Sequence, residues 1–91
     1  MKGRALLAWN IRRLRAERRL SQERLATEAE IDRVYVSELE NERANPSVDL
    51  LDKLAISLKV PLSEFFRVPE PGEKRPRILA SGRPPNSKTA R

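Results

Sequence analysis

The sequence predicts an all-α domain over residues 1–67, followed by a basic, proline-rich tail over residues 68–91. Two observations predict the helices: apolar residues recur at helical spacing, and capping residues stand before successive apolar stretches. A third observation separates the tail, which holds five of the seven prolines, two of the three glycines and few apolar residues. Such a segment cannot sustain a helix or build a core, so we expect a flexible tail.

The first two predicted helices are separated by a turn near residue 20. The first runs from about Arg4 to Arg18, and its apolar positions at helical spacing are Leu7, Ile11 and Leu14. Ser21 is placed to cap the second helix, because its hydroxyl can accept a hydrogen bond from a backbone N–H of the first turn. The match to a capping box is imperfect, since Arg24 stands where Glu or Gln is usual. The apolar positions of this second helix are Leu25, Ala26 and Ala29.

Three further helices are expected at short intervals. Asp32 is placed to cap the third, which ends near Asn41 because Pro46 keeps the residue before it out of the helical region. Ser47 opens the fourth helix, and Pro61 begins a short fifth at an early position where its missing N–H does no harm. The expected core residues are Leu14, Leu25, Ala26, Ile31, Val36, Leu39, Leu51, Leu54 and Ala55.

Composition excludes several classes of function. The chain has 91 residues, no cysteine and no histidine, so zinc fingers, thiol nucleophiles and Ser–His catalysis are excluded. It also lacks a phosphate-binding glycine loop and a nucleophile–base pair, so we expect no enzyme, no metal and no cofactor. No long apolar run is present, which predicts a cytoplasmic protein without a signal peptide or membrane contact.

The formal net charge of +6 is divided into blocks. Residues 1–24 carry eight basic and two acidic side chains. Residues 25–67 carry five basic and nine acidic side chains, and residues 68–91 carry six basic and two acidic side chains. A basic excess indicates a polyanionic partner, of which nucleic acid is the first candidate and anionic lipid the second. Because the middle block is acidic, specificity must depend on a few placed side chains, while the tail could add affinity that is salt-dependent and independent of sequence.

The second and third predicted helices, joined by a short turn, match the helix-turn-helix unit, whose second helix lies in the major groove of DNA. Four runs in this order resemble the Cro/cI-type helix-turn-helix domain (XRE family) of phage and bacterial repressors. The runs are Leu20–Ala26, Ile31–Asn41, Asn45–Ser47 and Leu51–Ala55. The resemblance covers about residues 6–66 and implies a five-helix, lambda-repressor-like fold. Within the family, residues 31–37 are similar to the controller proteins of restriction–modification systems, which are small dimeric autoregulators.

The chain departs from the family at two positions that favour a positive φ. The family often has glycine in the turn before its third helix and again after that helix, where this chain has Glu30 and Glu42. A non-glycine residue at either position implies either modest strain in the backbone or a shift of the helix cap to a neighbouring residue. Asn41 tolerates the left-handed conformation and is the candidate for a shifted cap.

Base-reading roles are expected at the third helix, and each has a structural alternative. The expected base-reading residues are Arg33, Val34, Ser37 and Glu38. Arginine can donate two hydrogen bonds to guanine, valine can contact the thymine methyl group, and glutamate can accept from cytosine N4. Alternatively, Arg33 is merely solvated, and Glu38 repels phosphate and orients Arg33 or Arg43.

Phosphate contacts are implied by the resemblance around the same helix. The expected residues are Gln22, Tyr35, Asn41, Arg43 and Asn45. Gln22 begins the second helix, where backbone N–H groups also favour an anion. The alternatives are a surface glutamine beside a cap, a tyrosine ring packed against the second helix, and an ordinary polar loop.

Two further sets of residues are expected to be structural. The resemblance implies a buried ion pair between Arg15 and Glu40 that joins the first helix to the third. Apolar residues beyond those that the core needs predict a homodimer formed by the fourth and fifth helices. The expected interface residues are Leu50, Ile56, Leu62, Phe65 and Phe66. Trp9 is expected in the core or in the dimer interface.

The predicted function is a sequence-specific transcriptional regulator that binds double-stranded DNA at an operator as a dimer, with the third helix in the major groove. The alternative is an antitoxin-type module whose tail binds a protein partner and which also binds its own promoter. The tail has one apolar run, Ile78–Ala80, which is either a short apolar spot or a strand added to that partner.

Overall fold

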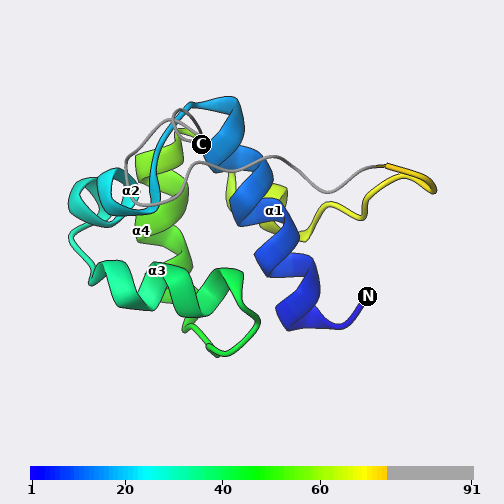
Figure 1. Cartoon of the computed structure of the whole chain (residues 1–91), viewed down its shortest axis with the longest axis horizontal. Coiled ribbons are helices and arrows are strands. Elements are labelled where there is room, and N and C mark those ends of the chain that lie inside the picture. Colours follow the sequence, from blue (N-terminus) through cyan, green and yellow to red (C-terminus); the bar gives the residue numbers. More distant parts are fainter. Residues whose placement is uncertain (74–91) are drawn as a thin grey trace, which may run out of the picture.

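The computed structural model describes residues 1–73, which contain four α-helices and a short 3-10 helix (Figure 1). The helices are α1 (Gly3–Glu17), α2 (Gln22–Ala29), α3 (Arg33–Glu40), α4 (Val48–Leu58) and the 3-10 helix η1 (Leu62–Phe66). The predicted all-α fold class is confirmed. No helix among these residues is long and apolar enough to cross a membrane. Residues 74–91, including the run Ile78–Ala80, lie outside the described part of the chain.

The fifth predicted helix is a 3-10 helix and not an α-helix. Its backbone begins with a hydrogen bond from the N–H of Glu64 to the carbonyl oxygen of Pro61 at 3.0 Å, the three-residue spacing of a 3-10 turn. Its five residues are too few for a regular α-helix of ordinary length. The tighter turn directs Phe65 into the core, where it is fully buried, and leaves Phe66 47% exposed.

Side-chain caps fix where three of the helices begin, as the sequence predicts. Ser21 and Ser47 each accept a hydrogen bond from the backbone N–H three residues later, at 3.0 and 3.1 Å. Asp32 accepts one from the N–H two residues later at 2.8 Å. Each bond satisfies a donor that the helix itself leaves free. These caps therefore set the register of α2, α3 and α4.

A non-glycine residue in the left-handed backbone conformation follows each of the four α-helices. These residues are Arg19, Glu30, Glu42 and Lys59, with φ between 55° and 62°. Glu30 and Glu42 thus occupy the two positions where strain or a shifted cap was expected, and the structure shows the strained alternative at both. Asn41 is the C-cap of α3, as expected, but it is not left-handed: its φ is −100°, because its backbone N–H continues the bonding pattern of α3 to Ser37.

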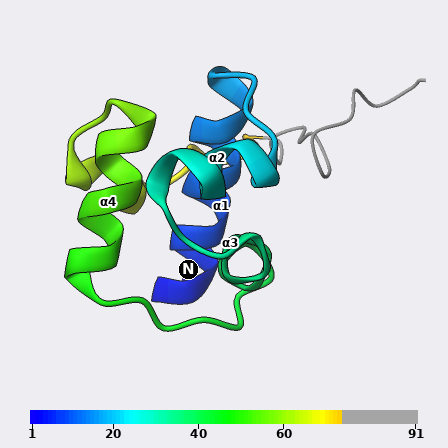
Figure 2. The same ribbon diagram turned by 90° about the vertical axis from the view of Figure 1, so that its left-hand side faces the viewer.

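The core lies between α1, α2 and α4, and α3 closes one side of it. Figure 2 looks along α3, with α2 above it and α4 to one side. Of the expected core residues, all are buried except Ile31, which is partly buried and packed against the core. Trp9 is also buried within the chain, at 7% exposure. The helices therefore share one hydrophobic core, which holds α3 in place from behind.

A polar contact that the apolar pattern does not reveal holds η1 against α1. Asn10 is fully buried, and its side-chain amide donates to the backbone oxygens of Phe65 at 2.8 Å and Arg67 at 2.9 Å. The ring of Trp9 lies 5.9 and 5.7 Å from the guanidinium groups of Arg13 and Arg67. Because an unpaired buried carbonyl is costly, the amide of Asn10 stabilises the end of the domain.

Candidate nucleic-acid interface

One face of α3 carries the four expected base-reading residues. Positions 33, 34, 37 and 38 follow helical spacing, opposite to the buried face formed by Val36, Leu39 and Glu40. Arg33 is exposed, and Val34 is 55% exposed although its side chain is apolar. Ser37 and Glu38 are partly buried one turn further along. The structure therefore brings these four residues together on a single outward face.

The expected phosphate-binding residues lie at both ends of the α2–α3 unit. Gln22 begins α2 and is partly buried, whereas Arg43 and Asn45 are exposed in the loop that follows α3. Asn41 ends α3, and its side-chain amide donates to the carbonyl oxygen of Ser37 at 2.9 Å. Tyr35 is partly buried and packs against the core. Gln22 contacts Glu40, the residue directly before Asn41 in the chain.

Arg15 and Glu40 form a bidentate ion pair inside the protein. Arginine Nε and Nη2 donate to the two carboxylate oxygens at 2.8 and 2.9 Å, and the two side chains are 0% and 1% exposed. Arg15 Nη1 also donates to the carbonyl oxygen of Leu20 at 2.8 Å. Such paired, charge-assisted hydrogen bonds are short and directional. The pair therefore fixes the end of α3 to the last turn of α1.

Two more side chains complete this contact. Gln22 Nε2 donates to Glu40 Oε1 at 3.0 Å, and Arg12 Nη2 donates to the backbone oxygen of Glu40 at 2.7 Å. We call the set of Arg12, Arg15, Gln22 and Glu40 the Glu40 junction. It joins α1, the first residue of α2 and the last residue of α3, so it sets the position of the outward face of α3 relative to the start of α2.

Sequence reasoning missed Arg12 as a member of this junction. Arg12 is assigned no role from the sequence. The available signal is the spacing of three residues between Arg12 and Arg15, which places both guanidinium groups on neighbouring parts of one helix face. That signal does not show which element lies opposite, because the contact spans 28 residues of sequence.

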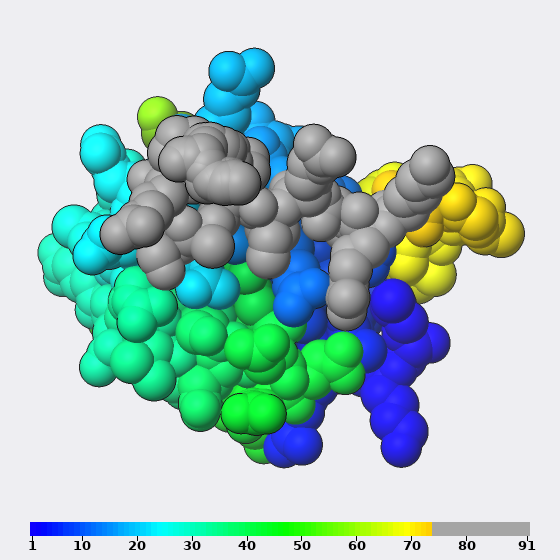
Figure 3. All heavy atoms as spheres, viewed as in Figure 1, coloured from blue at the N-terminus to red at the C-terminus, as the bar shows by residue number. Residues whose placement is uncertain are grey.

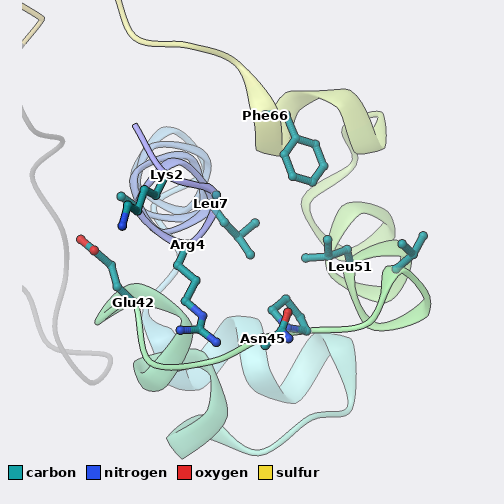
Figure 4. A pocket seen from close by; sticks show the side chains of 11 residues that line it. Lys2, Arg4, Leu7, Glu42, Asn45, Leu51 and Phe66 are labelled. Atoms are coloured by element: carbon teal, nitrogen blue, oxygen red, sulfur yellow. The ribbon is translucent and has the colours of Figure 1, made fainter.

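An open groove of about 690 Å³ lies beside the loop that follows α3 (Figure 4). Leu7, Leu51 and Phe66 form part of its apolar lining, while Arg4 and Asn45 lie at its polar edge. In Figure 4, the side chain of Arg4 extends from α1 toward this loop. The surface of the start of α1 thus adjoins that of the loop, as the space-filling view also shows (Figure 3).

The expected dimer residues differ in their availability for contact. Ile56 is 76% exposed on α4, and Phe66 is 47% exposed at the end of η1. Leu50 and Leu62 are partly buried and pack against the core. Phe65 is a correction: it is fully buried within the chain, because the 3-10 turn directs its ring inward, so it cannot form an intermolecular contact.

Residues 11–65 match the helix-turn-helix family HTH_3. This match covers more than half of the chain and includes α2, α3 and α4 completely. The chain belongs to the helix-turn-helix family. The predicted resemblance to the XRE type is thereby confirmed.

Relatives of this helix-turn-helix protein include regulators and controller proteins. It is 37% identical over 67 residues to a hypothetical transcription factor of Neisseria meningitidis, covering 74% of this chain and 63% of that protein. The solved structure of the transcription factor NHTF from Neisseria matches with a TM-score of 0.72, covering 75% of this chain and 78% of the other. The chain thus spans less than two thirds of the N. meningitidis protein in sequence.

Other matches include control proteins, among them controllers of restriction–modification systems. The control protein C.MunI from Mycoplasma is 40% identical over 57 residues, covering 62% of this chain and 77% of that protein. The structure of the restriction–modification controller protein C.AhdI from Aeromonas hydrophila is 35% identical with a TM-score of 0.67, covering 69% of this chain and 96% of the other. The predicted similarity to controller proteins is confirmed. Together the matches support regulation of transcription by DNA binding as the class of function.

Proposed function

We propose that this helix-turn-helix protein is a sequence-specific DNA-binding regulator of transcription without enzymatic activity, which reads an operator by placing α3 in the major groove. The arrangement of α3 carries the proposal. Its inner face is held by the core and by the Glu40 junction, while Arg33, Val34, Ser37 and Glu38 share its outer face. A reading helix must be held rigidly because base recognition depends on the placement of individual donors and acceptors.

The residues on this face match the chemistry of base edges. Arg33 can donate two hydrogen bonds to O6 and N7 of guanine, and Glu38 can accept one from N4 of cytosine. Val34 is an exposed apolar side chain next to Arg33, which suits contact with the methyl group of thymine. Ser37 can donate or accept at several bases. Base contacts by these four side chains would give the specificity that the net charge cannot give.

Phosphate contacts at both ends of the unit would fix its register on the duplex. At the start of α2, Gln22 has a second amide hydrogen and a backbone N–H in addition to its bond with Glu40. Asn41, Arg43 and Asn45 lie after α3 and would contact the backbone there, with Tyr35 between these two sites. Contacts of this kind position a protein without selecting a sequence.

A homodimer is part of the proposal because one α3 covers only half of a two-fold operator. Dimers of this class present two reading helices roughly 34 Å apart on one side of the duplex. The exposure of Ile56 and Phe66, together with the partly buried Leu50 and Leu62, supports an apolar interface outside the face of α3. Sedimentation at micromolar concentration is expected to show a dimer, and a monomer at that concentration would contradict this part of the proposal.

A gel-shift experiment tests the proposal as a whole. The full chain is mixed with the DNA upstream of its own gene and, separately, with random DNA of equal length and charge. We expect a complex with the upstream DNA that survives an excess of random competitor. Equal competition by both DNAs would contradict sequence-specific binding. The antitoxin-type alternative depends on residues 68–91, most of which lie outside the described residues, so it is not proposed.

A further inference from the structure

Two adjacent arginines of α1 have similar exposure but differ in how their charge is balanced. The side chains of Arg12 and Arg13 are 14% and 11% exposed. Arg13 Nη1 and Nη2 lie 3.4 and 3.0 Å from carboxylate oxygens of Glu17 and Glu64, and its Nε donates to Asn10 at 3.1 Å. All three nitrogens of Arg13 are therefore bonded, and two carboxylates neutralise its charge.

Arg12 is much less well balanced within residues 1–73. Only one of its five N–H donors forms a hydrogen bond there, and the acceptor is a neutral carbonyl, that of Glu40. Its Nε is buried without a hydrogen-bond partner among these residues and lies 3.9 Å from Glu40 Oε1. That carboxylate already accepts short hydrogen bonds from Arg15 and Gln22. Arg12 therefore competes poorly for the one anion near it.

Within residues 1–73, the side chains of the Glu40 junction carry two positive charges and one negative charge. Two guanidinium groups, those of Arg12 and Arg15, share the single carboxylate of Glu40. Both cations are largely buried. Buried charges are screened less than charges on an open surface. A charge kept in such a place without full compensation costs free energy. A second anion at the open side of Arg12 would remove this cost.

The position of Arg12 indicates which anion this is. Its Nη2 contacts the main chain of Glu40, directly before Asn41, and Glu40 in turn contacts Gln22. Gln22 and Asn41 are the residues that the proposed function places against DNA phosphates at the start of α2 and the end of α3. Arg12 thus lies at the junction that connects these two contacts, where the duplex backbone would pass.

We propose that Arg12 binds a backbone phosphate of the DNA and so supplies the anion that the Glu40 junction lacks. This inference rests on the proposed function. The hydrogen bond to Glu40 orients the guanidinium before DNA arrives, which lowers the ordering entropy that a flexible surface arginine loses on binding. The remaining N–H donors of Arg12 are of the kind that pair with phosphate oxygens. Phosphate binding also reinforces the bond that closes the end of α3.

The test compares salt dependence for Arg12→Gln, Arg12→Lys and the matched control Arg13→Gln. Binding to the upstream DNA and to random DNA is measured for the full chain over a range of salt concentrations. Arg12→Gln is expected to reduce the slope of log K against log salt by about 0.9, the value for one phosphate contact. Affinity for both DNAs then falls about tenfold at 0.1 M salt. Arg12→Lys and Arg13→Gln are expected to keep the slope.

A purely structural role for Arg12 predicts a different result. Arg12→Gln would then lower the melting temperature and the preference for the upstream DNA but leave the salt slope unchanged, and this outcome overturns the proposal. Loss of slope in Arg13→Gln as well would overturn it too, because any charge on α1 would then suffice. If the wild-type chain binds neither DNA, the proposed function itself fails and this inference falls with it.

A measurement on the wild-type chain avoids dependence on the folding of a variant. The side-chain NMR resonances of the two arginines are followed while a short duplex of the upstream DNA is added. Those of Arg12 are expected to shift with saturation of the complex, and those of Arg13 to stay in place. Unchanged Arg12 resonances in a saturated complex would overturn the proposal.

Discussion

The carboxylate of Glu40 has the same kind of partner as that of Glu28, but a very different environment. Arg15 contacts Glu40 at 2.8 Å, and Arg24 contacts Glu28 at 3.0 Å. The first pair is almost completely buried, whereas the side chain of Arg24 is 69% exposed. At the residue scale, burial therefore decides what each pair contributes to stability, because solvent weakens the exposed one.

Substitution of the two arginines makes this difference measurable. Arg15→Met is expected to lower the free energy of unfolding by about 3–5 kcal/mol, because it leaves the buried charge of Glu40 without its bidentate partner. Arg24→Met is the control and is expected to cost about 0–1 kcal/mol. Urea unfolding followed by circular dichroism provides both values. Similar losses for the two variants would contradict the assignment of Arg15 and Glu40 as the structural pair.

Arg33 and Arg43 have different proposed roles, since Arg33 would contact a base and Arg43 would contact a phosphate. Arg33→Ala is expected to weaken binding to the operator by about 1–3 kcal/mol and to relax the preference at one base pair. Arg43→Ala is expected to weaken binding to all sequences alike. Binding to a panel of single-base variants of the upstream DNA distinguishes them. Equal losses on specific and random DNA for Arg33→Ala would exclude its reading role.

At the scale of the elements, helix starts were predictable from the sequence and some helix ends were not. Ser21, Asp32 and Ser47 act on N–H groups two or three residues away, so their local sequence predicts their bonds. Glu42, and not Asn41, is the left-handed residue, because the N–H of Asn41 still bonds within α3 and the N–H of Arg43 turns back to the carbonyl oxygen of Glu38. The general tendency of asparagine to adopt the left-handed conformation does not predict which of the two residues adopts it here.

Relief of strain at the end of α2 is a prediction about an element. Glu30→Gly is expected to raise the free energy of unfolding by up to about 1 kcal/mol, because glycine adopts a positive φ without the steric cost of a side chain. Glu28→Gly removes the same charge from an ordinary helical position of α2 and is expected to lower it by about 1 kcal/mol. Thermal unfolding of both variants checks the sign. Destabilisation by both would show that Glu30 has a favourable contact in its strained conformation.

The contact between α1 and η1 was beyond sequence analysis for a related reason. Asn10 lies among apolar positions of a helix, and its bond to the carbonyl of Phe65 joins residues separated by 55 positions. The neighbouring aromatics Phe65 and Phe66 are equivalent in composition, and only the 3-10 turn decides which one enters the core. The sequence shows whether such a residue is apolar or polar, but it does not show which residue distant in the chain it contacts.

On the scale of the whole molecule, charge and specificity have different locations. Residues 74–91 contain six basic and no acidic side chains, whereas the region from α2 to α4 is net acidic. The overall net charge therefore does not describe the surface that would read the operator. The candidate site was predictable as a set of residues because the family resemblance supplies the positions, but its rigidity depends on the Glu40 junction, which only the folded chain forms.

Ending the chain after residue 73 tests this separation while keeping the contact of Arg67 with Glu73. We expect the shortened protein to bind DNA with a smaller dependence on salt and an unchanged ratio of affinities for upstream and random DNA, because the deleted charges cannot select a sequence. Fluorescence anisotropy at several salt concentrations measures both quantities. A fall in that ratio would show that residues 74–91 contribute to recognition.

The Glu40 junction has a further consequence for the opening motions of α3. Helices on a protein surface commonly exchange their amide hydrogens through local unfolding, without disruption of the core. Local opening of α3 would require removing Glu40 from its buried partners on α1 and α2. We therefore expect the amides at the end of α3 to exchange as slowly as those of the core, on the timescale of global unfolding. A hydrogen-exchange experiment would then show that the amides of α3 are as strongly protected as those of a buried helix, although α3 has an outward face.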